Sequence, residues 1–197
     1  MPNVSNDIAI VQLSSDIDIT ASVRPVSFGS FNDDLHQIVG KNGTVIGFGL
    51  EENDRISGPL REATITVVDF MDCLLYDRDA YASVLTRNMF CAVGKNNTSA
   101  CNGDSGGGMF FNVDGTWHLR GIVSFMPGRK HIPLLCDSSK PTVFTDVSKY
   151  REWVLRYKNT AKWLKELKPC QDGVVAEDAV CNAATRHGNV QIMTEQT

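Results

Sequence analysis

Residues 101–107 read Cys-Asn-Gly-Asp-Ser-Gly-Gly, and this stretch is more informative than any other part of the chain. Glycines on both sides of Ser105 let the backbone turn sharply, so that neighbouring N–H groups can point at one spot. A serine hydroxyl becomes an effective nucleophile when a base takes its proton and donors stabilise the oxyanion that forms. The alternative is an ordinary glycine-rich turn with an exposed serine, and the complete string favours the nucleophile.

The composition is that of a globular protein, with 197 residues of which 42% are hydrophobic and 21% charged. The formal net charge of −4 gives no electrostatic reason to bind nucleic acid, because neutralising phosphates requires a clustered basic surface. No apolar run approaches the roughly 20 residues that a membrane-spanning helix needs. We therefore expect neither a nucleic-acid nor a membrane partner.

Cysteines and glycosylation sequons point to export. The chain has six cysteines and no Cys-x-x-Cys pair, which favours disulfides over a zinc site. Asn-x-Ser/Thr sequons, each of them a weak signal alone, occur at Asn3, Asn42, Asn96 and Asn97. The first residues lack the basic and apolar segments of a signal peptide. We expect a secreted protein whose true N-terminus lies upstream.

Short apolar segments separated by turn residues predict an all-β domain. They cover residues 45–49, 63–70, 109–113, 117–125 and 143–147. Asn42-Gly43 and Asp114-Gly115 are predicted turns, the second within a hairpin. The β-branched run at residues 8–13 is predicted to be a buried strand. Many short strands of this kind are typical of an antiparallel sandwich or barrel.

The end of the chain has a different pattern. Apolar residues at helical spacing predict a helix over about residues 147–167, with Asp146 as its N-cap and Pro169 beyond its end. Residues 169–197 are polar and aperiodic, which predicts a flexible tail after a domain of residues 1–168.

The stretch around Ser105 resembles the nucleophile loop of chymotrypsin-like serine proteases, and the similarity extends from Asn6 to about Tyr157. Five other segments resemble that family in the same order along the chain, namely residues 6–13, 45–49, 89–92, 121–125 and 141–147. The resemblance implies a double antiparallel β-barrel with an incomplete N-terminal barrel and a C-terminal helix. It also implies a monomeric serine endopeptidase that acts on polypeptides, meets protein inhibitors and needs no cofactor or metal ion.

The family pattern assigns the catalytic roles. Ser105 would attack the scissile carbonyl, and the N–H groups of Gly103 and Ser105 would form the oxyanion hole. Asp7 would hold the catalytic histidine in its correct tautomer. Without the resemblance, Asp7 would be interpreted as a cap or turn residue. Asp104 would accept a salt bridge from the amine that activation cleavage creates.

The family histidine has no counterpart in this sequence. It precedes the aspartate in the family, whereas His36, His118, His131 and His187 all follow Asp7. We expect these four to be surface or loop residues, the histidine-bearing part to be missing, and the chain to be inactive in isolation. The alternatives are a non-catalytic homologue acting as a secreted binding or regulatory module, and an unrelated β-barrel.

Substrate preference follows from the same resemblance. Ser99, six residues before the nucleophile, would form the floor of the specificity pocket and carries no charge. Met126 and Thr142 would replace the wall glycines of roomy pockets, with Ser124 as a further substrate-binding residue. This elastase-like arrangement would favour a small apolar side chain.

The resemblance also implies the disulfides. Cys73–Cys91 and Cys101–Cys136 match bridges of the family. Cys170 and Cys181 lie outside the family segment, and they either pair with each other or reach the missing N-terminal part.

Overall fold

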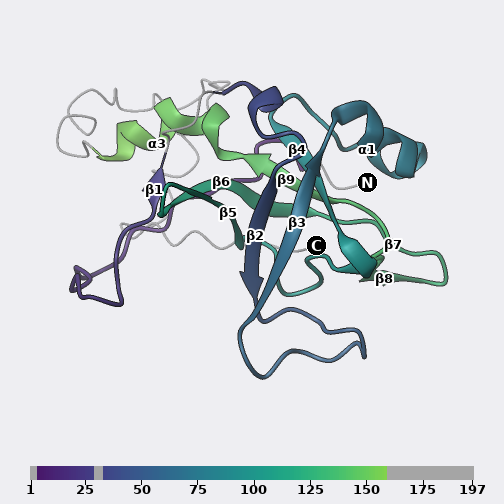
Figure 1. The fold of residues 1–197 in the computed structure, drawn as a ribbon, viewed down its shortest axis with the longest axis horizontal. Coiled ribbons are helices and arrows are strands. Elements are labelled where there is room, and N and C mark those ends of the chain that lie inside the picture. Colours follow the sequence, from purple (N-terminus) through teal and green to yellow (C-terminus); the bar gives the residue numbers. More distant parts are fainter. Residues whose placement is uncertain (1–3, 29–32, 159–197) are drawn as a thin grey trace, which may run out of the picture. The chain divides into compact units, whose positions relative to one another are not determined.

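The computed structural model describes residues 4–28 and 33–158 (Figure 1). The chain divides into two compact units, one made of residues 1–8 and 25–151 and the other of residues 9–24 and 152–197. No helix within the described residues is both long and apolar enough to cross a membrane.

The first unit is built around a closed antiparallel barrel. Its strands β6, β5, β2, β3, β4 and β9 pair in that order, and β9 pairs back with β6. β1 adds to β6 in parallel, and β7 and β8 form a separate hairpin. The strands are β1 Ser27–Phe28, β2 Asn42–Gly47, β3 Arg61–Val68, β4 Met89–Gly94, β5 Gly108–Val113, β6 Thr116–Phe125, β7 Gly128–Arg129, β8 Ile132–Cys136 and β9 Thr142–Asp146.

Helical segments connect and follow these strands. They are η1 Leu35–Gln37, α1 Phe70–Tyr76, α2 Arg78–Tyr81, η2 Lys95–Asn97, η3 Val147–Tyr150 and α3 Arg151–Lys158. Asp69 and Asp77 cap α1 and α2 by accepting hydrogen bonds from backbone N–H groups, which satisfies donors that have no partner within the helix.

Alternate residues of the strands fill the barrel. Ile65 and Val67 of β3 are buried, as are Met109 and Phe111 of β5, which is the period of two expected when one face of a strand packs inward. Phe90 and Phe144 stack with their ring centroids 5.3 Å apart. The apolar segments predicted at residues 45–49, 63–70, 109–113, 117–125 and 143–147 correspond to β2, β3, β5, β6 and β9, so the all-β prediction is confirmed.

One of the two predicted turns is wrong. Asp114 and Gly115 have φ values of 51° and 81° and connect β5 to β6, as the hairpin prediction required. Asn42 and Gly43 instead begin β2, opposite Thr66 and Ile65 of β3. Hydrogen bonding between β2 and β3 outweighs the local turn preference of the Asn-Gly pair.

The predicted buried strand at residues 8–13 is also wrong. These residues are in no strand, and Val11 and Leu13 are 60% and 55% exposed. A strand needs a partner for its backbone N–H and C=O groups, and no strand of the described residues pairs with this run. The barrel of β2–β6 and β9 is therefore the one closed barrel in the described part of the chain.

The C-terminal helical segment has the predicted N-cap, but its first turn is not α-helical. Asp146 is the N-cap, since its Oδ1 accepts a hydrogen bond from the N–H of Ser148 at 3.0 Å. The first turn is the 3₁₀ segment η3, and the α-helix α3 starts at Arg151. Within α3 the rings of Trp153 and Tyr157 meet edge-on at 5.3 Å. The rest of the predicted helix, the tail at 169–197, and Cys170, Cys181 and His187 lie outside the described residues.

Candidate active site

Two disulfides lie within the described residues, and one of them starts in the segment before Ser105. Cys73 is bonded to Cys91 and Cys101 to Cys136, with sequence separations of 18 and 35 residues. Both predicted pairings are therefore confirmed. Closing loops of such length stabilises a fold by about 3–4 kcal/mol each in the chain-entropy description.

The segment around Ser105 is a pair of tight turns fixed to strand β6. Gly103 and Gly106 have φ values of 96° and 80°, which only glycine adopts readily. The N–H of Gly106 donates to the carbonyl of Val123 at 2.9 Å, and the N–H of Val123 donates to the carbonyl of Gly107 at 2.8 Å. The turns thus hold Ser105, which is exposed, beside the end of β6.

The backbone donors of this loop suit a developing negative charge. Among the described residues, no protein acceptor is bonded to the N–H of Gly103 or of Ser105. Two such donors on consecutive tight turns can stabilise an oxyanion because they need little reorganisation as the charge forms.

The carboxylate of Asp104 joins the segment after β2 to the start of its own loop. It accepts hydrogen bonds from the N–H of Gly49 at 2.8 Å and from the N–H of Cys101 at 2.9 Å. A Cβ atom added at Gly47 or Gly49 would overlap this carboxylate. Both glycines are therefore needed for the strand end to approach Asp104 so closely.

Asp7 lies at the same end of β6. The hydroxyl of Ser124 donates to Oδ2 of Asp7 at 2.6 Å, and the hydroxyl of Thr145 donates to the carbonyl of Asp7 at 2.8 Å. Ser124 directly follows Val123, to which the turn after Ser105 is bonded. The structure therefore brings Asp7 and Ser105 to one end of one strand, although they are 98 positions apart in the sequence.

Two residues that hold the Asp7 segment in place were not predicted from the sequence. Thr145 binds its carbonyl, and the hydroxyl of Tyr150 donates to Oδ1 of the neighbouring Asn6 at 2.8 Å. Asn6 itself has a φ of 58°, a conformation that asparagine tolerates better than most residues. Thr145 falls within a segment that resembles the family, but nothing in the pattern marks it as a neighbour of Asp7.

The predicted pocket residues lie in three different settings. The hydroxyl of Ser99 donates to the carbonyl of Ala100 at 2.6 Å and lies 3.3 Å from Sδ of Met126. Thr142 is fully buried in β9, and its hydroxyl has no hydrogen-bond partner among the described residues. Ser124 faces Asp7. The structure thus brings together Ser99 and Met126, the predicted floor and one predicted wall.

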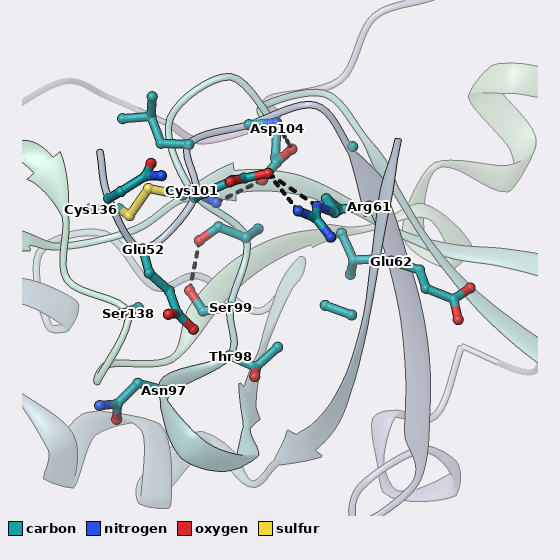
Figure 2. Close-up of a pocket in the computed structure, with 18 of the residues that line it drawn as sticks. Glu52, Arg61, Glu62, Asn97, Thr98, Ser99, Cys101, Asp104, Cys136 and Ser138 are labelled. Atoms are coloured by element: carbon teal, nitrogen blue, oxygen red, sulfur yellow. Dashed lines mark hydrogen bonds and ion pairs between the residues drawn. A yellow bond between two sulfur atoms is a disulfide. The ribbon is translucent and has the colours of Figure 1, made fainter. Parts of the chain in front are cut away.

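A polar hollow of about 520 Å³ is lined in part by Ser99 (Figure 2). Arg61 and Glu62 of β3 and residues 97–101 line it, together with Asp104. Arg61 is held there by Glu51, whose Oε1 accepts its hydrogen bond at 2.9 Å. The hydrogen bond from Ser57, followed by that from Arg61, lowers the pKa of Glu51.

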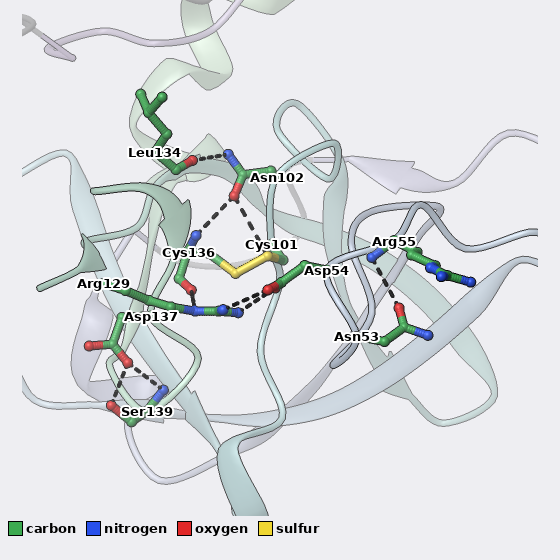
Figure 3. Close-up of polar contacts among 10 residues, drawn as sticks. All are labelled: Asn53, Asp54, Arg55, Cys101, Asn102, Arg129, Leu134, Cys136, Asp137 and Ser139. Carbon is green, nitrogen blue, oxygen red and sulfur yellow. Dashed lines mark hydrogen bonds and ion pairs between the residues drawn. A yellow bond between two sulfur atoms is a disulfide. The ribbon is translucent and has the colours of Figure 1, made fainter. Parts of the chain in front are cut away.

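The segment after Met126 forms the β7–β8 hairpin, which is held by several hydrogen bonds (Figure 3). Arg129 donates two hydrogen bonds to Asp54, of 2.9 and 2.7 Å, and a third of 3.0 Å to the carbonyl of Cys136. The side chain of Asn102 donates to the carbonyl of Leu134 at 3.0 Å and accepts from the N–H of Cys136 at 2.9 Å. These bonds tie the hairpin both to the 51–57 loop and to the segment that precedes Ser105.

The contact between Asp54 and Arg129 predicts an acid-sensitive hairpin. The hydrogen bonds from Arg129 lower the pKa of Asp54 below its usual 3.8. The stabilisation is therefore complete above pH 3.8 and is lost as the pH falls through the lower value of the folded state. Corrected for intrinsic exchange rates, amide protection of β8 should drop a few-fold between pH 5 and pH 2.5.

The matched variants are Asp54→Asn and Asp114→Asn. Asp54→Asn should show the reduced protection of β8 already at pH 5, whereas Asp114→Asn, in the β5–β6 turn, should behave as the parent chain. Equal protection of β8 in Asp54→Asn and the parent at pH 5 would contradict the assignment.

Three of the four histidines lie within the described residues. His36 lies in η1, His118 in β6 opposite Phe111 of β5, and His131 between β7 and β8. None of the three is hydrogen-bonded to Ser105. Residues 4–28 and 33–158 also contain no group of three or more His, Cys, Asp or Glu side chains placed to hold a metal ion.

Comparison with known proteins gives a consistent result. Residues 1–154 match the model of the trypsin family. Chymotrypsin-C of Bos taurus is 36% identical over 154 residues, which cover 77% of this chain and 54% of that protein. CLIP domain-containing serine protease B15 of Anopheles gambiae is 35% identical over 161 residues, or 78% of this chain and 42% of the relative. CLIP domain-containing serine protease B4 of Anopheles gambiae is 29% identical over 153 residues, which cover 76% of this chain and 40% of that protein.

The chain thus spans about half the length of the curated relatives that it matches. The match covers the whole of the barrel, and the tight turns at Ser105, the predicted disulfides and the barrel topology agree with it. The protein belongs to the trypsin family of chymotrypsin-like serine proteases.

Proposed function

We propose that this chain carries the nucleophile, the oxyanion donors and the acidic residue of a secreted serine endopeptidase. Ser105 attacks the scissile carbonyl while a histidine, supplied from outside the described residues, takes the hydroxyl proton. The N–H groups of Gly103 and Ser105 stabilise the oxyanion. The histidine then protonates the leaving amine, and water hydrolyses the acyl-enzyme and regenerates Ser105.

One observation carries this proposal. The turns that present Ser105 and the hydrogen bond that holds Asp7 both end on adjacent residues of β6, Val123 and Ser124. A histidine ring between these two residues would be oriented by Asp7 and would take the hydroxyl proton of Ser105. This is the arrangement that nucleophilic catalysis by serine requires.

We also propose that the substrate pocket accepts only a small apolar side chain. The support is the contact of 3.3 Å between Sδ of Met126 and the hydroxyl of Ser99. Because of this contact, the Met126 side chain extends as far as the predicted pocket floor. Met126 also packs against the barrel core. A large substrate side chain would have to displace this methionine from its packing, which costs binding energy.

Replacing Met126 by glycine should therefore change the substrate preference. In a catalytically competent fusion of this chain behind the histidine-bearing part of a relative, the parent should prefer alanine or valine before the cleaved bond. In Met126→Gly the ratio of kcat/KM for leucine or phenylalanine over that for alanine should rise by about 10- to 200-fold, the usual range for filling or emptying an apolar pocket. A fluorogenic substrate panel measures both.

Met126→Leu is the control, since it keeps the volume and should keep the preference. Strong cleavage after arginine or lysine by the parent would overturn the proposed pocket. An unchanged ratio in Met126→Gly would show that another side chain limits the pocket.

A second candidate function is a non-catalytic, secreted binding module. It is favoured by the absence of any hydrogen bond between Ser105 and a histidine within residues 4–28 and 33–158. A fusion that folds, forms both disulfides and yet cleaves no peptide would favour this candidate over the endopeptidase.

A further inference from the structure

We propose that Asn96, in the exposed turn after β4, carries an N-linked oligosaccharide and that its neighbour Asn97 does not. The inference concerns a modification site and is independent of the proposed peptidase activity. It rests on the disulfides, on the environments of the three described sequons, and on the hollow beside the turn.

The disulfides indicate the compartment. Cys73–Cys91 joins α1 to β4, and Cys101–Cys136 joins the segment before Ser105 to β8. Such bonds form and persist where the surroundings are oxidising, as in the endoplasmic reticulum and outside the cell. N-glycosylation occurs in the same secretory route, so Asn-x-Ser/Thr sequons on this fold are exposed to the transferase.

The three sequons of the described residues differ in their surroundings. Asn42 begins β2 in the barrel wall, and its Oδ1 accepts a hydrogen bond of 2.7 Å from the hydroxyl of Thr66 on β3. Asn42 is exposed as well, but this bond fixes its amide against the sheet, so that Nδ2 is less free to carry a sugar. Asn96 and Asn97 lie in η2, a surface turn in which Lys95 to Thr98 are all exposed. A surface turn is the setting that accommodates a bulky glycan.

The hollow distinguishes the two asparagines of the turn. Asn97 lines it together with Thr98 and Ser99, and Figure 2 shows Asn97 at the end away from Asp104. Asn96 is not among the lining residues, although both asparagines are exposed and have similar positive φ values, of 54° and 58°. An oligosaccharide on Asn97 would have to share the hollow with its polar walls, whereas one on Asn96 would not.

The overlapping sequons allow each asparagine to be tested separately. Asn96 depends on the hydroxyl of Thr98, and Asn97 depends on that of Ser99. Thr98→Ala therefore removes the Asn96 sequon and keeps that of Asn97. Asn97→Gln removes the Asn97 site and keeps the sequence Asn96-Gln-Thr98.

The experiment expresses the full chain behind a secretion signal in eukaryotic cells and compares its mass before and after treatment with peptide N-glycosidase. Enzymatic removal in ¹⁸O-labelled water marks each occupied asparagine as a labelled aspartate in peptide maps. We expect the label at Asn96, its persistence in Asn97→Gln and its loss in Thr98→Ala and Asn96→Gln.

The chain retained in the endoplasmic reticulum is mapped as well as the secreted chain, because the sugar is transferred before export. The occupancy of each asparagine can then be determined even for a variant that is not secreted. A label confined to Asn97 or Asn42, or no label at Asn96 in either fraction, would overturn the proposal.

Discussion

A serine-directed fluorophosphonate probe should leave Ser105 of the isolated 197-residue chain unlabelled, and the chain should cleave no peptide substrate above the background of its Ser105→Ala variant. Ser105 needs a base within hydrogen-bond reach, about 2.6–3.2 Å, and none of His36, His118 and His131 is bonded to it. In a related triad, removing the serine or the histidine alone lowers kcat by about 10⁶-fold. The measurement is labelling stoichiometry by intact mass, after both disulfides have been verified.

Restoring the base is the complementary experiment. A fusion of the chain behind the histidine-bearing part of bovine chymotrypsin-C should become labelled at Ser105 and should cleave peptides. Asp7→Asn in that fusion should lower kcat by about 10⁴-fold, because the histidine would then adopt the wrong tautomer. Stoichiometric labelling of Ser105 in the isolated chain would contradict the prediction, and His36→Gln, His118→Gln and His131→Gln would then identify the base.

Replacing Arg120 by methionine should destabilise the barrel by about 3–5 kcal/mol. The guanidinium of Arg120 on β6 donates to both carboxylate oxygens of Asp146, at 2.9 and 3.0 Å, and their side chains are 1% and 2% exposed. Removing the cation leaves the carboxylate buried without its counter-charge. The free-energy cost of this unpaired charge exceeds the net contribution of the ion pair to stability. The free energy of unfolding from urea titration measures the effect.

Arg61→Met is the matched control. Arg61 also pairs with a carboxylate, that of Glu51 at 2.9 Å, but its side chain is 63% exposed, so water replaces the lost partner and little stability is lost. Similar losses in Arg120→Met and Arg61→Met would show that burial does not control the strength of the Arg120 pair.

Asp146 is expected to respond differently from Arg120. Its Oδ1 also accepts from the N–H and the hydroxyl of Ser148, at 3.0 and 2.6 Å, and so caps the 3₁₀ turn that leads into α3. Changing Asp146 therefore removes a helix cap as well as the ion pair. This is why Arg120, and not Asp146, is the informative site for the substitution.

Local patterns in the sequence were sufficient to predict five of the strands and the nucleophile turn. The apolar runs of β2, β3, β5, β6 and β9 are visible because a strand buries alternate or consecutive residues. The turns at Ser105 are visible because glycine is needed at 103 and 106 for positive φ. The disulfide pairs were available only through the resemblance to the family, since cysteine counting leaves several pairings open.

Local patterns predicted the wrong structure where pairing with a distant segment of the chain determined the conformation. Residues 8–13 have the composition of a strand but pair with no described strand, and Asn42-Gly43 has the composition of a turn but pairs with β3. In both cases hydrogen bonding to a distant segment, or its absence, outweighs intrinsic preference.

The sequence by itself determined that Ser105 sits on a tight, glycine-flanked turn, because the residues that shape the turn are its immediate neighbours. Only the tertiary structure decided what surrounds that turn. Ser124 reaches Asp7 across 117 positions, Arg129 reaches Asp54 across 75, and Met126 reaches Ser99 across 27. These contacts depend on the register in which the barrel closes, and register is set by the packing of whole strands and not by the residues that happen to meet.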